Sequence, residues 1–156
     1  MASSGQPQGS GFPKVGVGAV VWRGNDVLLV KRSKPPLEHQ WSLPAGKQEA
    51  GETLHDTVTR EVFEETGVAV DVLGLIDVVD AIFRAEDGTL QYHYTIIDFS
   101  ARYLSGEAHA ASDAAAVAWA PLDRIGDYDM WERTVRMIMD SARRHGPLAP
   151  PGLVSD

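Results

Sequence analysis

Three glutamates at helical spacing are the residues of this chain best suited to do chemistry. Glu61, Glu64 and Glu65 stand at positions i, i+3 and i+4 in the segment 46–68, which reads GKQEAGETLHDTVTREVFEETGV. In a helix this spacing places all three carboxylates on one face, within about one turn. Like charges so placed repel by roughly 0.2–0.5 kcal/mol per pair in an isolated helix. The cluster therefore indicates that the carboxylates hold a cation, because folding alone would not favour it.

The same segment carries start and stop signals for a helix between Thr53 and Gly67. Thr53 with Asp56 three positions later resembles a capping box in which the acid replaces the usual Glu. Gly67 stands where a residue in the left-handed conformation commonly ends a helix. One stripe of this helix is apolar, and it consists of Leu54, Val58 and Val62.

The helical arrangement places the acidic residues beside this apolar stripe. Glu61 and Glu65 border the stripe, Glu64 lies a little further round, and Phe63 points the other way. We therefore expect one flank of the helix to be packed and its acidic edge to face a cleft.

Hydrophobic periodicity predicts strands on both sides of this helix. Before it we expect a hairpin of strands and a short extended piece, at 15–22, 27–32 and 41–44. After it we expect two strand segments, a hairpin turn, a long strand, a loop and a last strand, at 68–75, 76–83, 86–89, 90–104, 105–115 and 117–122. An amphipathic helix follows, marked by Trp131, Val135, Ile138 and Ala142 and ending at Gly146. This order predicts the α/β (α+β) class, with a mixed sheet and a helix on each face.

Composition predicts one ordinary globular domain. The chain has 156 residues, of which 44% are hydrophobic and 23% are charged. We expect residues 1–13, rich in Gly, Ser, Gln and Pro, to be a disordered leader, 14–146 the folded domain, and 147–156 a flexible tail. The chain has no cysteine, which excludes disulfides and thiolate metal sites and suits the cytoplasm, the location that we expect.

Net charge and hydropathy argue against two classes of partner. The net charge of −8 opposes affinity for duplex nucleic acid, which needs a basic surface. The longest apolar runs fall short of the roughly 18 residues that a membrane helix needs, and residues 1–14 lack the basic and apolar regions of a secretory signal. A small phosphate-bearing substrate stays compatible with the charge, because a bound divalent cation reverses the local field.

The segment 46–68 also fits the spaced pattern G-x5-E-x7-R-E-U-x-E-E-x-G-U, in which U is a bulky aliphatic residue. The fixed letters are Gly46, Glu52, Arg60, Glu61, Glu64, Glu65 and Gly67, and the aliphatic places are Val62 and Val68. This pattern resembles the Nudix box, and the chain is identified as a member of the Nudix hydrolase family, similar to its ADP-ribose pyrophosphatases. The resemblance covers about residues 14–144 and implies a Nudix-type α/β/α sandwich with a mixed β-sheet.

The resemblance implies that the chain uses Mg²⁺ or Mn²⁺ to cleave a nucleoside diphosphate linked to another moiety, at the pyrophosphate. Glu61 and Glu65 would be the first metal ligands and Glu64 the third, joined by the backbone carbonyl of Ala45. Oxygen donors of this kind are those that Mg²⁺ prefers. Bound metal ions would acidify a water molecule and neutralise charge on the phosphates.

Five further residues are assigned supporting roles. By resemblance, Arg60 would hold the carboxylates in place through charge-assisted hydrogen bonds, and Glu52 would contact the metal or substrate through water. Gly46 opens the box and is expected beside the substrate. Arg32, and less so Lys31, could hold substrate phosphates at the end of the second strand. Exposed charges at a strand end are the alternative interpretation of this pair.

The identity of the general base is open between two regions of the chain. Some family members use a glutamate of the box, for which Glu61 is the candidate, and others use an acid on a later loop. Glu107 and Asp113 lie in the expected loop 105–115. Glu107 is preferred because it lies nearer the end of the preceding strand.

The group attached to the pyrophosphate is also open. The segments DVVDAIF and QYHYTIIDF are similar to those of ADP-ribose pyrophosphatases, which favours ADP-ribose-like substrates. Phe83 departs from that pattern, because it stands where such enzymes have a proline about fifteen residues after the box. Nucleoside triphosphates, including oxidised dNTPs, are the alternative substrates, and a catalytically silent module that binds nucleotides is the alternative to an enzyme. The resemblance also allows a homodimer.

Four aromatic residues on the expected strands are candidates for stacking on a base or ribose. They are Trp22, Phe83, Tyr92 and Tyr94. Aromatic residues in strands are more often part of the core, which is the alternative interpretation for each of them.

Overall fold

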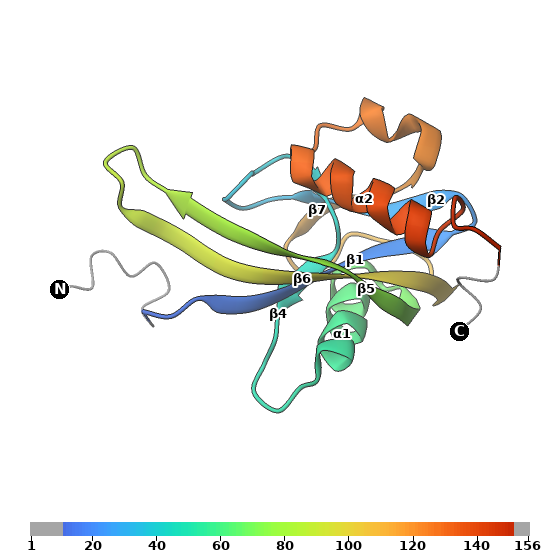
Figure 1. The fold of residues 1–156 in the computed structure, drawn as a ribbon, viewed down its shortest axis with the longest axis horizontal. Helices are drawn as coiled ribbons and strands as arrows, with labels where there is room; N and C mark the ends of the chain where they lie inside the picture. The colour runs from blue at the N-terminus through green and yellow to red at the C-terminus, as the bar shows by residue number, and fades with distance from the viewer. Residues whose placement is uncertain (1–10, 152–156) are drawn as a thin grey trace.

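One mixed sheet with a helix on each face makes up most of residues 11–151, the part of the chain that this computed structural model describes (Figure 1). The strands are β1 (Lys14–Arg23), β2 (Asp26–Arg32), β3 (Trp41–Ser42), β4 (Ala45–Lys47), β5 (Ala69–Arg84), β6 (Leu90–Ser105) and β7 (Ala114–Pro121). The helices are α1 (Leu54–Thr66), the 3-10 helix η2 (Leu122–Asp127) and α2 (Glu132–Arg144). The predicted fold class is confirmed.

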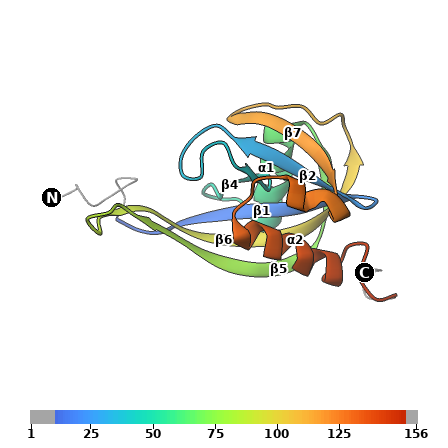
Figure 2. The ribbon, with the colours of Figure 1, turned by 90° about the horizontal axis from the view of Figure 1, so that it is seen from above.

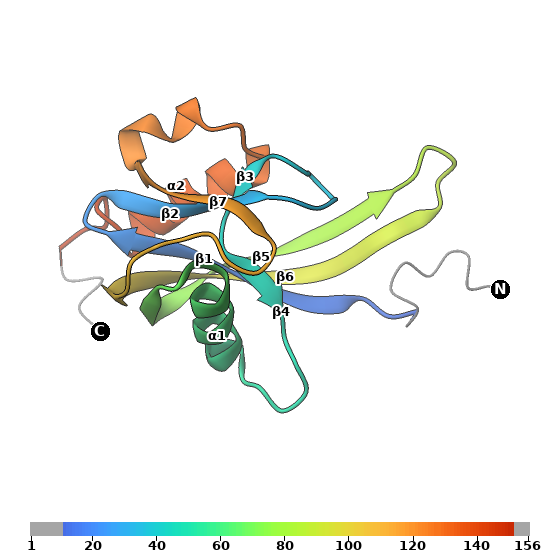
Figure 3. The ribbon, with the colours of Figure 1, turned by 180° about the vertical axis from the view of Figure 1, so that it is seen from behind.

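The order of strands in the sheet is β3-β2-β1-β6-β5, with β4 also paired to β1 and β7 to β2. β1 and β6 are parallel from Lys14↔Tyr94 to Trp22↔Arg102, and the other pairs are antiparallel. The predicted hairpin of β1 and β2 forms, but it is paired only next to its turn, at Trp22 and Arg23. Seen from behind, β7 lies along β2 (Figure 3).

Two strand predictions are corrected by the structure. The segments 68–75 and 76–83 form the single strand β5, whose pairing with β6 shifts register at several points instead of breaking. The last strand begins at Ala114, not at Val117, and Leu122 belongs to η2. The alanines at the start of β7 have weak intrinsic strand preference, but they pair with Lys31 and Arg32 of β2.

Alternating residues of β1 face two separate cores. Val20 and Trp22 pack with Ile138 and Ala142 of α2 on one face of the sheet. Val17, Ala19 and Val21 pack with Val58 and Val62 of α1 on the other face. Because α1 is held by its apolar stripe, its remaining surface is free to carry charge, and the long β5–β6 hairpin extends beyond this body (Figures 1 and 2).

A buried chain of hydrogen bonds fastens α2 to the sheet. The indole Nε1–H of Trp22 donates to Ser141 Oγ at 2.8 Å, and Ser141 Oγ lies 2.6 Å from Ser100 Oγ. Ser100 Oγ in turn lies 2.8 Å from Nδ1 of His145, at the end of α2. A buried polar group that loses its partner is destabilising, so this chain holds α2 in one position on the sheet.

We expect Ser141→Ala to lower the free energy of unfolding by about 1–3 kcal/mol, because it leaves the buried Trp22 Nε1–H without an acceptor. The measurement is urea unfolding followed by Trp fluorescence. Ser105→Ala is the control, since Ser105 is exposed at the end of β6. Equal unfolding free energies for the two variants would contradict this role of Ser141.

The predicted leader and tail lie mostly outside the described residues, which exclude 1–10 and 152–156. At the start of the predicted tail, the Leu148 N–H donates to the Ala142 carbonyl at 3.0 Å. No helix within residues 11–151 is long and apolar enough to span a membrane.

Candidate active site

The helix that carries the acidic cluster begins and ends where its caps predict. Thr53 Oγ1 accepts a hydrogen bond from the Asp56 N–H at 3.1 Å, as a capping residue does. Gly67 adopts φ +78°, and its N–H donates to the Phe63 carbonyl at 2.8 Å. A Cβ at Gly67 would also lie 2.4 Å from the ring of His109, so both conformation and space require glycine there.

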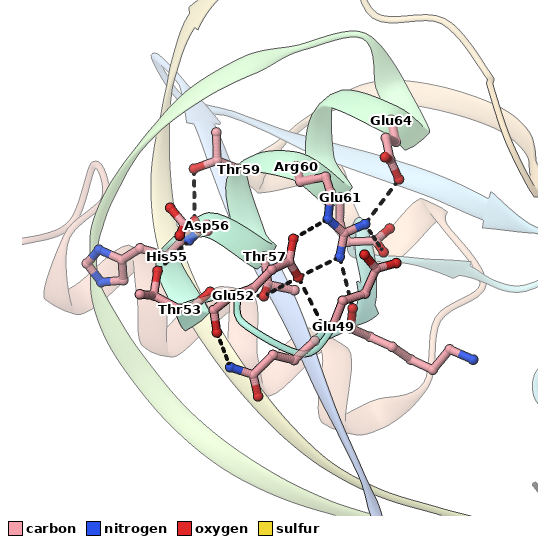
Figure 4. A network of polar contacts seen from close by, with 12 residues as sticks. Glu49, Glu52, Thr53, His55, Asp56, Thr57, Thr59, Arg60, Glu61 and Glu64 are labelled. Atoms are coloured by element: carbon pink, nitrogen blue, oxygen red, sulfur yellow. Dashed lines mark hydrogen bonds and ion pairs between the residues drawn. The ribbon is translucent and has the colours of Figure 1, made fainter.

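Arg60 lies at the centre of the acidic residues and binds three of them (Figure 4). Its Nε and Nη2 donate to the two carboxylate oxygens of Glu52, at 2.5 and 2.9 Å. Its Nη1 donates to Glu61 at 2.9 Å and to Glu64 at 3.2 Å, and Nη2 also reaches the Lys47 carbonyl at 3.0 Å. The expected role of Arg60 as the holder of these carboxylates agrees with this geometry.

Glu52 connects the loop before α1 to the helix. Besides Arg60, its carboxylate accepts from the Glu49 N–H and from Thr57 Oγ1, both at 3.0 Å. The hydrogen bonds from Arg60 are the main reason that the pKa of Glu52 falls to about 2. Glu52 is therefore held as a carboxylate that positions Arg60, and its contact with metal or substrate stays a prediction.

Glu61 lies directly over the backbone of Gly46. A Cβ at Gly46 would lie 1.9 Å from Cδ of Glu61, so the absence of a side chain there makes room for this carboxylate. Burial raises the pKa of Glu61, although the hydrogen bond and charge of Arg60 oppose the rise.

Glu65 is the other partly buried carboxylate of the helix. One of its oxygens accepts the Ala45 N–H at 3.0 Å, which places Glu65 against strand β4. Burial raises the pKa of Glu65 to about 7, opposed by the bond from Ala45 and reinforced by repulsion from Glu61. The charged forms of both neighbouring carboxyl groups, Glu61 and Glu65, are disfavoured by burial. A cation bound between them would stabilise these charged forms.

Glu64 differs from its two neighbours. Its side chain is 55% exposed and pairs with Arg60 on the outer side of the helix. Within residues 11–151, no group of three or more His, Asp or Glu side chains is arranged so that it could hold a metal ion. The hard oxygen donors available near one another, Glu61, Glu65 and the backbone of Ala45, do suit Mg²⁺ or Mn²⁺ in chemical type.

Two cavities adjoin this acidic face of α1. One, of about 640 Å³, is formed by the loop after β4 and contains Lys47, Glu52 and Glu61. The other, of about 380 Å³, contains Glu65 and Arg32 and is of the size that small molecules occupy. Because the second also holds most of the aromatic candidates, we take it as the substrate cavity.

Three of the four aromatic candidates line the substrate cavity, and the fourth does not. Tyr92, Tyr94 and Phe83 line it together with Trp131, whose ring centroid lies 5.8 Å from that of Phe83. Trp22 is 4% exposed and belongs to the core instead, where it binds Ser141. The core interpretation is therefore correct for Trp22.

The basic residues and backbone positions predicted to meet substrate lie around the same cavity. Arg32, Lys31, Ala45 and Gly46 all line it. Arg32 Nε donates to the Pro36 carbonyl at 2.7 Å, and the charge of Arg32 lowers the pKa of Glu65. The arrangement brings Arg32 close to the acidic face, although α1 and β2 are far apart in the sequence.

The two loop acids occupy different places. Asp113 lines the substrate cavity, pairs with Lys34 at 3.2 Å, and raises the pKa of Glu65 through its charge. Glu107 lies near the C-terminal end of α1, where its carbonyl contacts His109, and it lines neither cavity. Position therefore does not favour Glu107 over Asp113. The end of the loop 105–115 that carries Asp113 lies at the cavity, whereas the start of the loop, which carries Glu107, does not.

Two residues of the substrate cavity escaped the sequence analysis. Trp131 is predicted only as part of the amphipathic helix, and no role is predicted for Asp98 on β6. The signal for Asp98 is an acid in the middle of the apolar run TIIDF, at a position that alternation with Ile97 and Phe99 turns away from the α1 face.

Comparison with known proteins gives a consistent result. The NUDIX domain model matches residues 12–140. The ADP-ribose pyrophosphatase of Methanocaldococcus jannaschii is 33% identical over 113 residues, which are 72% of this chain and 64% of that protein. A Mycobacterium tuberculosis protein named "Putative 8-oxo-dGTP diphosphatase 2" is 35% identical over 127 residues, or 81% of this chain and 85% of that protein.

The solved structures agree with the sequence relatives. The MutT NUDIX hydrolase of Burkholderia pseudomallei superposes with a TM-score of 0.71 at 30% identity, over 83% of this chain and 98% of that one. The match to the family model spans the sheet, the acidic helix and most of α2. This chain belongs to the NUDIX domain family.

Proposed function

We propose that this protein is a Mg²⁺- or Mn²⁺-dependent pyrophosphohydrolase that cleaves a nucleoside diphosphate linked to another moiety, with ADP-ribose-like substrates favoured. The observation that carries this proposal is the pair Glu61 and Glu65, of which Glu61 is held by Arg60 and Glu65 is held by Ala45 at the wall of the cavity with the aromatic residues. Family membership and the archaeal ADP-ribose pyrophosphatase relative support it.

Glu61, Glu65 and the Ala45 carbonyl would hold the metal, with Glu64 available from the outer side of the helix. Bound there, the metal would activate a water molecule and stabilise charge on the phosphates. The role of Arg60 is to keep Glu61 in place, since its guanidinium contacts Glu61 and Glu64 and is itself fixed by Glu52. Gly46 leaves the space that the Glu61 carboxylate needs.

Arg32 would bind the phosphates of the substrate, and the aromatic residues would bind its base or ribose. Arg32 lies at the cavity wall near Glu65, where its positive charge suits the phosphates. Tyr92, Tyr94 and the Phe83–Trp131 pair offer flat apolar surfaces for a base or ribose. The same cavity thus joins an anion-binding end to an aromatic end.

Asp113 is the loop acid that we propose as general base, because it lines the cavity that contains Glu65. We expect Asp113→Ala to lower kcat by about 10²-fold or more, since a positioned base contributes about 10²–10⁴-fold. Glu107→Ala, the matched loop variant, should keep near-normal turnover. Steady-state kinetics on the preferred substrate test this, and full activity in both variants would return the role to Glu61.

The activity itself is tested with a panel of ADP-ribose, NADH, dinucleoside polyphosphates, dNTPs and 8-oxo-dGTP in Mg²⁺, with product release measured by chromatography. We expect ADP-ribose to be cleaved with the highest kcat/KM. Binding without cleavage of any member would contradict an enzyme and favour a nucleotide-binding module.

Hydrolysis of nucleoside triphosphates, including oxidised dNTPs, is the second candidate. It is favoured by the mycobacterial relative, of which the matched region covers 85%. Higher kcat/KM on 8-oxo-dGTP than on ADP-ribose would select this candidate.

A further inference from the structure

Asp98 is a buried acid that faces the substrate cavity. It lies in the middle of β6, is only 6% exposed, and lines the cavity together with Gly18 and Tyr94. Its carboxyl group lies against the backbone of the neighbouring strand, since a Cβ at Gly18 would come within 2.2 Å of its Oδ1. Gly18 therefore leaves space for this side chain, as Gly46 does for Glu61.

Within residues 11–151 the Asp98 side chain has no hydrogen-bond or ion-pair partner, and its oxygens are not among the fully enclosed polar atoms, so they open onto the cavity. Burial raises its pKa to about 7, with a smaller contribution from the charge of Asp77. A buried carboxyl group without a partner is disfavoured in a protein interior. A purely structural role does not account for it, because an apolar residue at this position would avoid the penalty.

The surroundings of Asp98 limit what it could bind. The cavity wall includes four aromatic residues, Tyr92, Tyr94, Phe83 and Trp131, so a planar group with apolar faces fits that part of it. A polar group on the same wall fixes the orientation of a ligand by meeting its polar edge. Purine bases combine these two properties.

We propose that Asp98 binds the polar edge of the substrate base and accepts a hydrogen bond from an exocyclic amine, such as that of adenine. A carboxyl oxygen accepts a hydrogen bond from an amine whether or not the group is protonated. Asp98 is thus a specificity residue of the cavity and takes no part in the bond cleavage at Glu61 and Glu65.

Because this role rests on the proposed nucleotide chemistry, its test needs a part that does not depend on turnover. Wild-type protein is titrated by calorimetry with AMP and with purine riboside monophosphate, which lacks the exocyclic amine. We expect AMP to bind about tenfold more tightly, the order of one lost hydrogen bond to a buried group. Equal affinity for the two ligands overturns the role of Asp98, whether or not the protein hydrolyses any substrate.

Variants then assign the contact to Asp98. Asp98→Leu, of similar size and apolar, should raise KM for ADP-ribose about tenfold with kcat within about threefold of wild type, as a contact made equally in ground and transition states predicts. Asp98→Asn should stay close to wild type, because an amide oxygen also accepts a hydrogen bond. Asp77→Asn is the matched control, since Asp77 is the exposed partner of Asp98 on β5.

Three results would overturn the proposal. They are an unchanged KM in Asp98→Leu, a fall in kcat without a change in KM, and a loss in Asp98→Asn as large as in Asp98→Leu. If Asp98→Leu does not fold, the calorimetric comparison of the two nucleotides in wild-type protein decides the question. Absence of hydrolysis together with the amine-dependent affinity would reject the enzyme and keep the base contact.

Discussion

Glu65→Gln is expected to lower Mg²⁺-dependent turnover by about 10³-fold, because a positioned metal ion contributes several kcal/mol to stabilisation of the transition state. The amide keeps the size of Glu65 and an acceptor for the Ala45 N–H, which donates to it at 3.0 Å. A loss of turnover would therefore be due to the missing negative charge and not to a change in the shape of the site. Kinetics on ADP-ribose over a Mg²⁺ titration measure it, and full turnover in this variant would reject the metal role of Glu65.

The same substitution should stabilise the metal-free protein at alkaline pH. Burial raises the pKa of Glu65 from 4.5 to about 7 in the folded state. A raised carboxyl pKa means that the penalty is absent below the unfolded pKa, grows as pH rises between the two values, and is complete above about pH 7. We expect Glu65→Gln to exceed wild type in unfolding free energy by about 1–3 kcal/mol at about pH 8 and by nearly nothing at about pH 4.5.

Urea unfolding in EDTA at the two pH values is the measurement. Glu86→Gln serves as the control, because Glu86 is exposed in the β5–β6 turn. A stability gain for Glu65→Gln that is the same at both pH values would show that the effect is not the ionisation of this carboxyl group. Addition of Mg²⁺ should make wild type the more stable of the two proteins at about pH 8, because Mg²⁺ binds wild type more tightly than Glu65→Gln.

Gly46→Ala is expected to lower kcat by about 10²-fold or more, of the order seen when a reacting group is displaced by about 1 Å. The new Cβ would lie 1.9 Å from Cδ of Glu61. Glu61 is a flexible side chain, so its carboxylate would move while the backbone stays, and its bond to Arg60 would break.

Gly46→Ala should therefore lose activity while it keeps most of its stability. We expect the unfolding free energy of Gly46→Ala to change by no more than about 1 kcal/mol, since the displaced pair with Arg60 is partly exposed. Gly126→Ala is the matched control, because a Cβ at Gly126 meets no atom within 4 Å. Steady-state kinetics and urea unfolding of both variants test this expectation. A normal kcat in Gly46→Ala would mean that the position of Glu61 is not critical.

Local sequence was sufficient for the elements whose signals lie close together in the chain. The cap at Thr53, the left-handed end at Gly67 and the exposed Phe63 were all predictable, because each depends on neighbours within one or two helical turns. The spacing that indicates the family is of the same kind, since a helix converts it directly into a shared face.

Contacts between distant segments were not predictable in this way. Nothing in β1 and β6 indicates that they pair in parallel, because that pairing is set by where the intervening chain returns. Likewise only the folded loop shows that Asp113, and not Glu107, lines the cavity, and which of them is the general base stays a prediction.

The sequence by itself determined the acidic helix, its caps and the mixed α/β class, and it predicted a cation-dependent chemistry on phosphates. Only the tertiary structure decided that Glu64 is exposed whereas Glu61 and Glu65 are partly buried, and that Asp98 faces the substrate cavity. The physical reason is that burial and the pKa values it shifts depend on all the elements that surround a side chain. A residue type and its spacing specify which groups are available, and packing sets their charge and their reach.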